Sequence, residues 1–298
     1  MITRPEPPGS GREAAFDLEN LSGGWRWMAA LGLAGAALIA GAAVETTRRA
    51  FAGHVDRLQR AVDDARGAVG PRTDLPAEVL ALARRLGVSG DDRPRLVRLT
   101  QSGEMWLKPG GRPLAFTAAQ TLAVAQTDFL WRARLSMAAG AVLQVIDYLV
   151  GDEAGLEARL MGAVPLVRAT GDDAAFRGEA MRYLAELMWN PDALLFNRSL
   201  DWRVIDPRTL AVATGDGARR GEVRLILDEA GDLVAMEADD RPRQDGARLV
   251  PTPWFGRGGA FRTLGGRLIP TEAEVGWILD GEEFVYWRGR IESWSPEA

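Results

Sequence analysis

Few side chains in this sequence have the type and spacing that acid–base catalysis needs. Glu179 and Glu186 are the best-spaced carboxylates, because seven residues along a helix return a side chain to the same face about 10 Å away. That separation is long for a retaining glycosidase and at the loose end for an inverting one. An ion-paired or solvated helix face is therefore the favoured interpretation, and a carboxylate-dependent hydrolase is the least favoured function.

A second polar set lies in the C-terminal third of the chain. Asp239 and Asp240 offer oxygen ligands of the kind that hard cations prefer, but adjacent strand residues point to opposite faces. Glu272 and Glu274 share one face and need cationic partners if that face is buried. We interpret the set first as a structural ion-pair cluster and second as a site that orients a ligand. Its members are Asp240, Arg241, Thr271, Glu272, Glu274 and Arg288.

The composition excludes several chemistries. Cysteine is absent, which excludes disulfides, thiolate catalysis, cysteine-ligated zinc, iron–sulfur clusters and a lipid-modified N-terminal cysteine. The single histidine, His54, stands alone, and no GxSxG motif accompanies it. The net charge of −5 provides no basic field that would attract nucleic acid. We predict no cofactor, no metal and no nucleic-acid partner.

An apolar segment near the N-terminus sets the predicted domain organisation. Residues 1–24 are rich in Pro, Gly and charged residues, which is typical of a disordered tail. Residues 25–46 predict a transmembrane helix, because the uncharged run from Trp27 to Val44 reaches the lower limit for a membrane span. A cleaved signal peptide with a small-residue site at residues 40–42 is the stronger alternative, and a buried Ala/Gly-rich helix is the weaker one.

The rest of the chain is predicted to form a juxtamembrane helix and linker at residues 47–74 and a β-rich domain at residues 75–298. Arginines that follow the apolar segment favour a cytoplasmic position for this domain, and an exported domain is the alternative.

One amphipathic helix is predicted inside the β-rich domain, from Arg177 to Leu195. Asp172 or Asp173 would cap it, and Pro191 would end it. Segments with period-two alternation lie on both sides, and residues 129–137 are the clearest of them. Each has one wetter face, which favours antiparallel strands over buried parallel ones. Two runs of strands separated by a helix predict an α+β fold, with the helix laid against a large antiparallel sheet.

Several short strings resemble a bacterial family of unknown function whose members combine a membrane segment with this domain. The strings are PTPWxG (251–256), PTExEVxW (270–277), YWRG (286–289) and GExxRYLAE (178–186). The resemblance covers about Leu75 to Trp294 and implies a single-pass protein of the bacterial inner (cell) membrane. The family's pattern is also similar to the half-barrel of lipoprotein-sorting carriers. It therefore implies a strongly curved antiparallel sheet with a helix across its concave face.

A curved sheet with a helix across its mouth leaves an apolar cavity, and such cavities bind hydrophobic ligands. The first hypothesis is therefore a membrane-anchored, non-enzymatic domain that binds a lipid or another amphiphile. The predicted cavity residues are Trp131, Tyr183, Leu184, Leu187, Met188, Trp189, Trp254, Trp277 and Trp287.

Two alternative functions make different predictions about the same cavity. A structural or protein-interaction domain would have Leu184, Leu187 and Met188 fill the cavity, leaving only its surface for unknown protein partners. The hydrolase hypothesis requires a buried carboxylate with a strongly raised pKa beside a pocket.

Overall fold

The computed structural model describes residues 21–67, 70–246 and 248–298, with side chains described from residue 40 onward. The chain forms two compact units that divide between Thr46 and Thr47, and helix α1 (Leu21–Asp63) runs through the division. Most of the predicted tail, residues 1–20, lies outside the described residues.

The predicted membrane span falls largely outside the described side chains as well, since these begin at residue 40. Among the residues that the structure describes, no helix is both long and apolar enough to cross a membrane.

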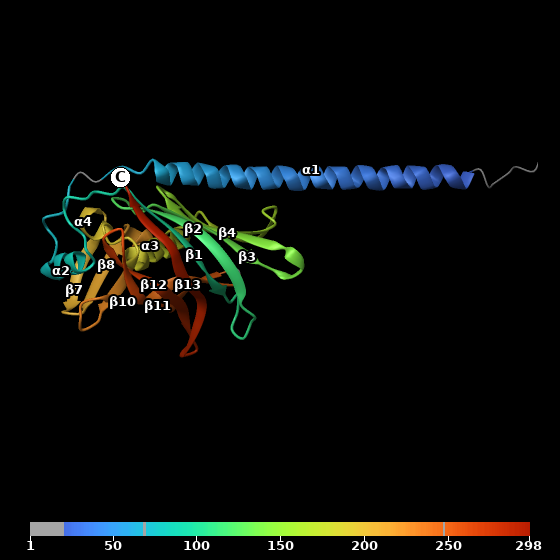
Figure 1. Ribbon diagram of the computed structural model, residues 1–298. Coiled ribbons are helices and arrows are strands. Elements are labelled where there is room, and N and C mark those ends of the chain that lie inside the picture. The colour runs from blue at the N-terminus through green and yellow to red at the C-terminus, as the bar shows by residue number, and fades with distance from the viewer. Residues whose placement is uncertain (1–20, 68–69, 247) are drawn as a thin grey trace, which may run out of the picture. The chain divides into compact units, whose positions relative to one another are not determined.

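The second unit is built on one sheet of 13 strands, in which every neighbouring pair is antiparallel (Figure 1). The order across the sheet is β6-β5-β4-β3-β2-β1-β13-β12-β11-β10-β9-β8-β7. The strands are β1 (Leu96–Met105), β2 (Leu114–Ala123), β3 (Phe129–Ser136), β4 (Val142–Val150), β5 (Glu153–Leu160), β6 (Val164–Thr170), β7 (Asp201–Asp206), β8 (Thr209–Thr214), β9 (Gly221–Leu227), β10 (Leu233–Asp245), β11 (Arg248–Leu264), β12 (Arg267–Leu279) and β13 (Glu282–Glu297).

The chain enters and leaves the sheet at its centre, because β1 pairs with β13, while β6 and β7 form the two edges. We call β1–β6 the N-terminal wing and β7–β13 the C-terminal wing. The segment between the two edge strands contains α3 (Asp173–Ala185), and α3 contacts β4, β5 and β6 of one wing and β8, β9 and β10 of the other. The remaining helices are α2 (Ala77–Arg85), η2 (Ala138–Gly140), η3 (Glu186–Met188), α4 (Ala193–Phe196) and η4 (Gly217–Arg219).

Local sequence explains where α3 begins. The carboxylate of Asp172 accepts a hydrogen bond from the backbone N–H of Ala175 at 2.7 Å, which satisfies a donor that the first helical turn leaves free. The helix thus begins earlier than the predicted Arg177. It gives way to η3 after Ala185, and Pro191 lies between η3 and α4. The single predicted helix is therefore three short segments.

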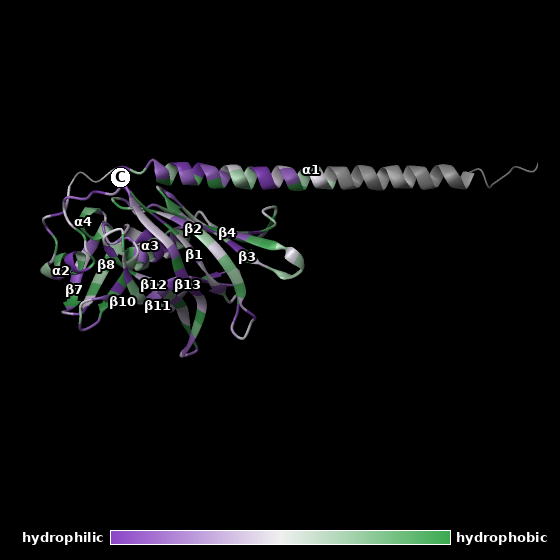
Figure 2. Cartoon of the chain, viewed as in Figure 1, coloured by the Kyte–Doolittle hydropathy of each residue, from purple (hydrophilic) through white to green (hydrophobic). Residues whose placement is uncertain are grey.

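Part of the N-terminal wing is buried on both faces. Along β3, Phe129, Trp131 and Leu135 point into the main core. The opposite face contributes Leu130, which packs with buried side chains of the Thr47–Asp63 part of α1. Figure 2 shows hydrophilic and hydrophobic residues alternating along that part of α1, as expected of a helix with one buried stripe.

The architecture is an antiparallel half-barrel with α3 packed on its strands, which confirms the predicted α+β class and the antiparallel sheet. One strand, β6, was missed by the sequence prediction. Its residues Val164–Val167 are exposed on both faces, so no alternation marks them.

Candidate functional site

A cavity of about 530 Å³ is lined by α3 and by strands of both wings. Its volume falls within the range of roughly 300–1,000 Å³ that ligand pockets occupy. Aromatic side chains form much of the wall, and they are Trp106, Trp131, Trp189, Trp254, Trp277, Phe284, Tyr286 and Trp287.

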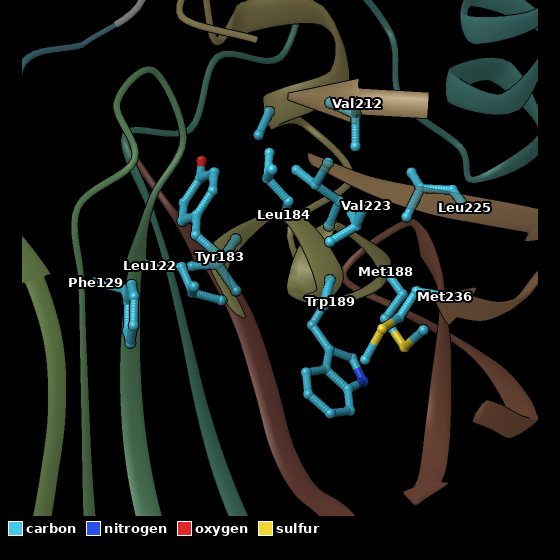
Figure 3. Close-up of a cluster of buried hydrophobic side chains, with 14 of the residues drawn as sticks. Leu122, Phe129, Tyr183, Leu184, Met188, Trp189, Val212, Val223, Leu225 and Met236 are labelled. Carbon is cyan, nitrogen blue, oxygen red and sulfur yellow. The ribbon is translucent and has the colours of Figure 1, made fainter. Parts of the chain in front are cut away.

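The predicted cavity residues divide into two groups. Trp131, Met188, Trp189, Trp254, Trp277 and Trp287 line the cavity. Tyr183, Leu184 and Leu187 lie instead in the core, where each is fully buried. Figure 3 shows Tyr183 and Leu184 within this cluster, and the Tyr183 hydroxyl donates to the carbonyl of Ala123 at 2.9 Å. The apolar stripe of α3 therefore packs into the core, and the helix turns a different face to the cavity.

Protein groups already satisfy the indole N–H of three wall tryptophans. Trp131 donates to Gln101 Oε1 at 2.8 Å and Trp189 donates to the carbonyl of Pro270 at 2.9 Å. Trp254 donates to the Tyr286 hydroxyl at 3.2 Å. These bonds fix the ring positions and leave the apolar ring faces for the cavity.

A bulge in β13 adds to the aromatic wall. Val275 pairs with Trp287 and Gly276 pairs with Val285, so Tyr286 is an extra residue between them. An extra residue interrupts strict alternation, which allows Tyr286 and Trp287 both to line the cavity. Tyr286 also stacks on Trp277, with ring centroids 5.8 Å apart.

The face that α3 turns to the cavity is charged. Arg182 forms an ion pair with Asp147 of β4 and a second with Glu186, whose Oε1 lies 3.0 Å from Arg182 Nε. Gln120 Nε2 donates to the other oxygen of Glu186. The Arg182 guanidinium also lies 4.9 Å from the centre of the Trp131 ring. The predicted ion-paired helix face exists, but it is buried rather than solvated.

Glu179 adds a third buried carboxyl to this cluster. Burial raises its pKa well above the ordinary value, and the negative charge of Asp147 and a hydrogen bond between the two side chains act in the same direction. Glu179 Oε2 and Asp147 Oδ1 are enclosed and have no hydrogen-bond partner in the described part of the chain. The arrangement favours the neutral form of the Glu179 carboxyl.

Sequence reasoning missed Asp147. The available signal was its position inside β4, where it is the single charged residue of an otherwise mostly apolar strand. A buried charge of that kind requires a partner, and Arg182 supplies it.

The predicted polar cluster is not one site. Asp240 is exposed and forms an ion pair with Arg177, while Arg241 is buried and lines the cavity. Glu274 lines the cavity and pairs with Arg257 and with the exposed Arg288, in each case at 3.1 Å. The remaining two members, Thr271 and Glu272, are not cavity-lining residues: the first donates to the carbonyl of Ala260, and the second is exposed.

A bulge in β10 determines which of Asp240 and Arg241 faces the cavity. Ala238 pairs with Trp254 and Arg241 pairs with Thr252, so Asp239 and Asp240 stand opposite a single residue of β11. Strict alternation from the buried Ala238 would point Asp240 inward and Arg241 outward. The bulge reverses this and brings the arginine, rather than the aspartate, to the cavity.

In the described part of the chain, no group of three or more His, Cys, Asp or Glu side chains is arranged so that it could hold a metal ion. His54 lies outside the cavity, 3.5 Å from Glu157.

The fold and the site together define an antiparallel half-barrel with an aromatic cavity under its bridging helix. The chain belongs to a family of unknown function (DUF6544), whose model matches residues 71–289. None of the curated proteins matches the chain.

Three solved structures are similar over about three quarters of the chain. A LolA superfamily protein from Nitrosomonas europaea has 12% identity and a TM-score of 0.41, covering 74% of this chain and 92% of its own. A DUF1329 family protein from Desulfovibrio piger has 12% identity and a TM-score of 0.41, covering 73% and 91%. A domain described as an outer membrane lipoprotein-sorting protein, from Vibrio parahaemolyticus, has 8% identity and a TM-score of 0.40, covering 74% and 91%. Likeness at this level carries no argument about function, which must come from the cavity itself.

Proposed function

We propose that the half-barrel is a binding module that holds a lipid or another hydrophobic ligand in its cavity. The observation that carries the proposal is the aromatic wall around a space of about 530 Å³. The N–H groups of Trp131, Trp189 and Trp254 are bonded within the protein, so these rings offer a ligand their apolar faces. Each methylene that moves from water into such a site contributes about 0.8 kcal/mol.

The filled-cavity alternative requires three side chains to occupy this space. Leu184 and Leu187 are fully buried in the core, and Met188 packs in the same core and also lines the cavity. A cavity large enough for a ligand is left beside them, which favours the binding module.

Carboxylate-dependent hydrolysis is a second candidate, because Glu179 is a buried carboxyl with a raised pKa beside the cavity. However, its Oε2 atom is enclosed by protein, as is Oδ1 of Asp147. A catalytic acid must reach the atom that it protonates. The pair is therefore better explained as part of the wall, and the absence of ester hydrolysis during a binding experiment would test this.

Gly178 provides a direct test of ligand binding. It lies on α3 in the cavity wall, and a Cβ atom added there would meet nothing closer than the carbonyl oxygen of Pro242 at 3.9 Å. Gly178→Leu would therefore fill cavity space, whereas Gly178→Ala adds one methyl group in ordinary contact.

The measurement is a titration of the full chain with dodecanol, in which tryptophan fluorescence reports binding. We expect wild type and Gly178→Ala to bind, and Gly178→Leu to bind at least about tenfold more weakly while remaining folded. Equal binding by all three proteins would place the ligand elsewhere, and no binding by wild type would refute the proposal.

A further inference from the structure

The cavity wall holds one buried arginine without a carboxylate partner. Arg241 is 8% exposed, and among the described residues no carboxylate oxygen lies within 4.0 Å of its guanidinium. Its Nε donates to the carbonyl of Gly178 at 3.2 Å, but its two Nη atoms have no acceptor in the described part of the chain. Neither Nη is among the enclosed atoms that lack a partner, so neither is fully enclosed, and Arg241 is one of the residues that line the cavity.

The other charged side chains of the wall near Arg241 have their direct ion-pair partners elsewhere. Arg182 pairs with the carboxylates of Asp147 and Glu186, and Arg257 and Arg288 flank Glu274. Glu179 is directed to Asp147, and burial favours its neutral form. The positive charge of Arg241 therefore has no direct carboxylate contact among the described residues, and its electrostatic interaction with Glu179 is a longer-range one.

The guanidinium is also held in place. It lies 4.3 Å from the centre of the Trp254 ring and 5.5 Å from that of Trp277, and Gly178 of α3 binds its Nε. A cation held against aromatic rings loses little freedom when it binds an anion. A guanidinium presents two parallel donors that match a carboxylate or a phosphate.

We propose that Arg241 is the anchor for the anionic head group of the cavity ligand, which is an amphiphile ending in a carboxylate or a phosphate. The head group accepts hydrogen bonds from the Nη atoms, and the apolar chain lies against the tryptophan wall. This inference rests on the proposed function, because it assigns the head group of a ligand whose chain occupies the same cavity. It also explains why the β10 bulge matters, since the bulge is what brings Arg241 into the wall.

The test compares amphiphiles that have one chain length and different heads. The full chain is titrated with dodecanoate, monododecyl phosphate, dodecanol and dodecylamine, each below its micelle concentration, and tryptophan fluorescence gives each Kd. Wild type should bind one or both anions at least about tenfold more tightly than dodecanol. Inorganic phosphate is a further arm, which separates recognition of an amphiphile from recognition of the free anion.

Two variants assign the preference to Arg241. Arg241→Met should bind dodecanol as wild type does and should lose the preference for anions. Arg241→Lys should keep part of that preference, because a lysine retains the positive charge but lacks the two parallel donors of a guanidinium. Arg290→Gln is the matched control, since Arg290 is exposed and paired with Glu292 at 2.6 Å. It should leave every Kd unchanged. Dodecanol binding reports whether each variant is folded, and the wild-type comparison needs no variant.

Each remaining outcome is decisive. Equal binding of alcohol and anions, or a preference that survives in Arg241→Met, overturns the anchor while the proposed function stands. A preference for dodecylamine overturns it in favour of the carboxyl pair of Asp147 and Glu179. Tight binding of inorganic phosphate without dodecyl phosphate points to a small-anion site instead. If no amphiphile binds, the proposed function fails and the anchor fails with it.

Discussion

The cavity wall contains a half-buried arginine, Arg182, and a buried one, Arg241, in contrasting surroundings. Arg182 belongs to α3 and faces the N-terminal wing, where the carboxylates of Asp147 and Glu186 accept its hydrogen bonds. Arg241 belongs to the C-terminal wing, where its neighbours are aromatic rings and one backbone carbonyl. A buried charge whose partners come from the protein contributes to the fold, whereas one without them is available to a ligand. The difference separates a structural cluster from a candidate recognition site.

The largest expected effect is the loss of Arg182. Arg182→Met would leave two buried carboxylates without their cation, and breaking a buried ion pair in this way costs roughly 3–5 kcal/mol. Chemical denaturation of the full chain should show this loss at neutral pH. A change below about 1 kcal/mol would mean that the cluster is solvated, and the contrast with Arg241 would disappear.

Removal of the Glu179 charge should have a smaller, pH-dependent effect. The pKa of Glu179 is raised in the folded chain, so its contribution to stability is fully present below the ordinary carboxyl pKa and is lost as the pH rises through the folded value. Glu179→Gln keeps a neutral side chain at every pH. It should therefore stabilise the protein relative to wild type increasingly as the pH rises above about 4.5, and not below.

The checking measurement is the free energy of unfolding of wild type and Glu179→Gln across a pH series. Glu186, whose pKa burial also raises, is present in both proteins and cancels in the difference. A difference that does not change with pH would refute the raised pKa of Glu179.

The stability of Arg241→Met tests whether Arg241, unlike Arg182, contributes little to the fold. The variant loses one hydrogen bond and two ring contacts, but it also removes a buried cation that lacks a counter-ion. The two terms oppose each other, so the free energy of unfolding should change by no more than about 1 kcal/mol in the absence of ligand. A loss as large as that of Arg182→Met would show that Arg241 is structural.

The smallest effect is expected at Arg288, which the sequence placed in the polar cluster. It is exposed and pairs with Glu274, and surface ion pairs contribute about 0–1 kcal/mol. Arg288→Gln should therefore change neither thermal stability nor ligand affinity measurably. A clear loss of ligand binding would return this residue to the site.

Local rules predicted much of the fold. The cap at Asp172 and the alternation of Phe129–Ser136 follow from hydrogen-bonding chemistry and strand geometry that a short stretch of sequence contains. The exposed Val164–Thr170 carries no such pattern and was missed.

The site was harder to predict, because its position depends on tertiary structure. The pattern of polar residues along the helix suggested a solvated face for Glu179 and Arg182. These side chains are largely enclosed instead, because α3 lies between two wings of the sheet that also cover its charged face. Alternation from the buried Ala238 would also turn Arg241 away from the cavity, because a strict period of two does not include the bulge at Asp239 and Asp240. The tryptophans of the wall were easier to find, as large aromatic side chains commonly line such cavities.

Native mass spectrometry of the intact chain as purified, followed by solvent extraction, tests the central claim most directly. We predict one amphiphile per chain in wild type and in Gly178→Ala, with an acidic head group in the extract, and none in Gly178→Leu. A ligand-free mass for wild type, unchanged after incubation with mixed lipids, would contradict the account.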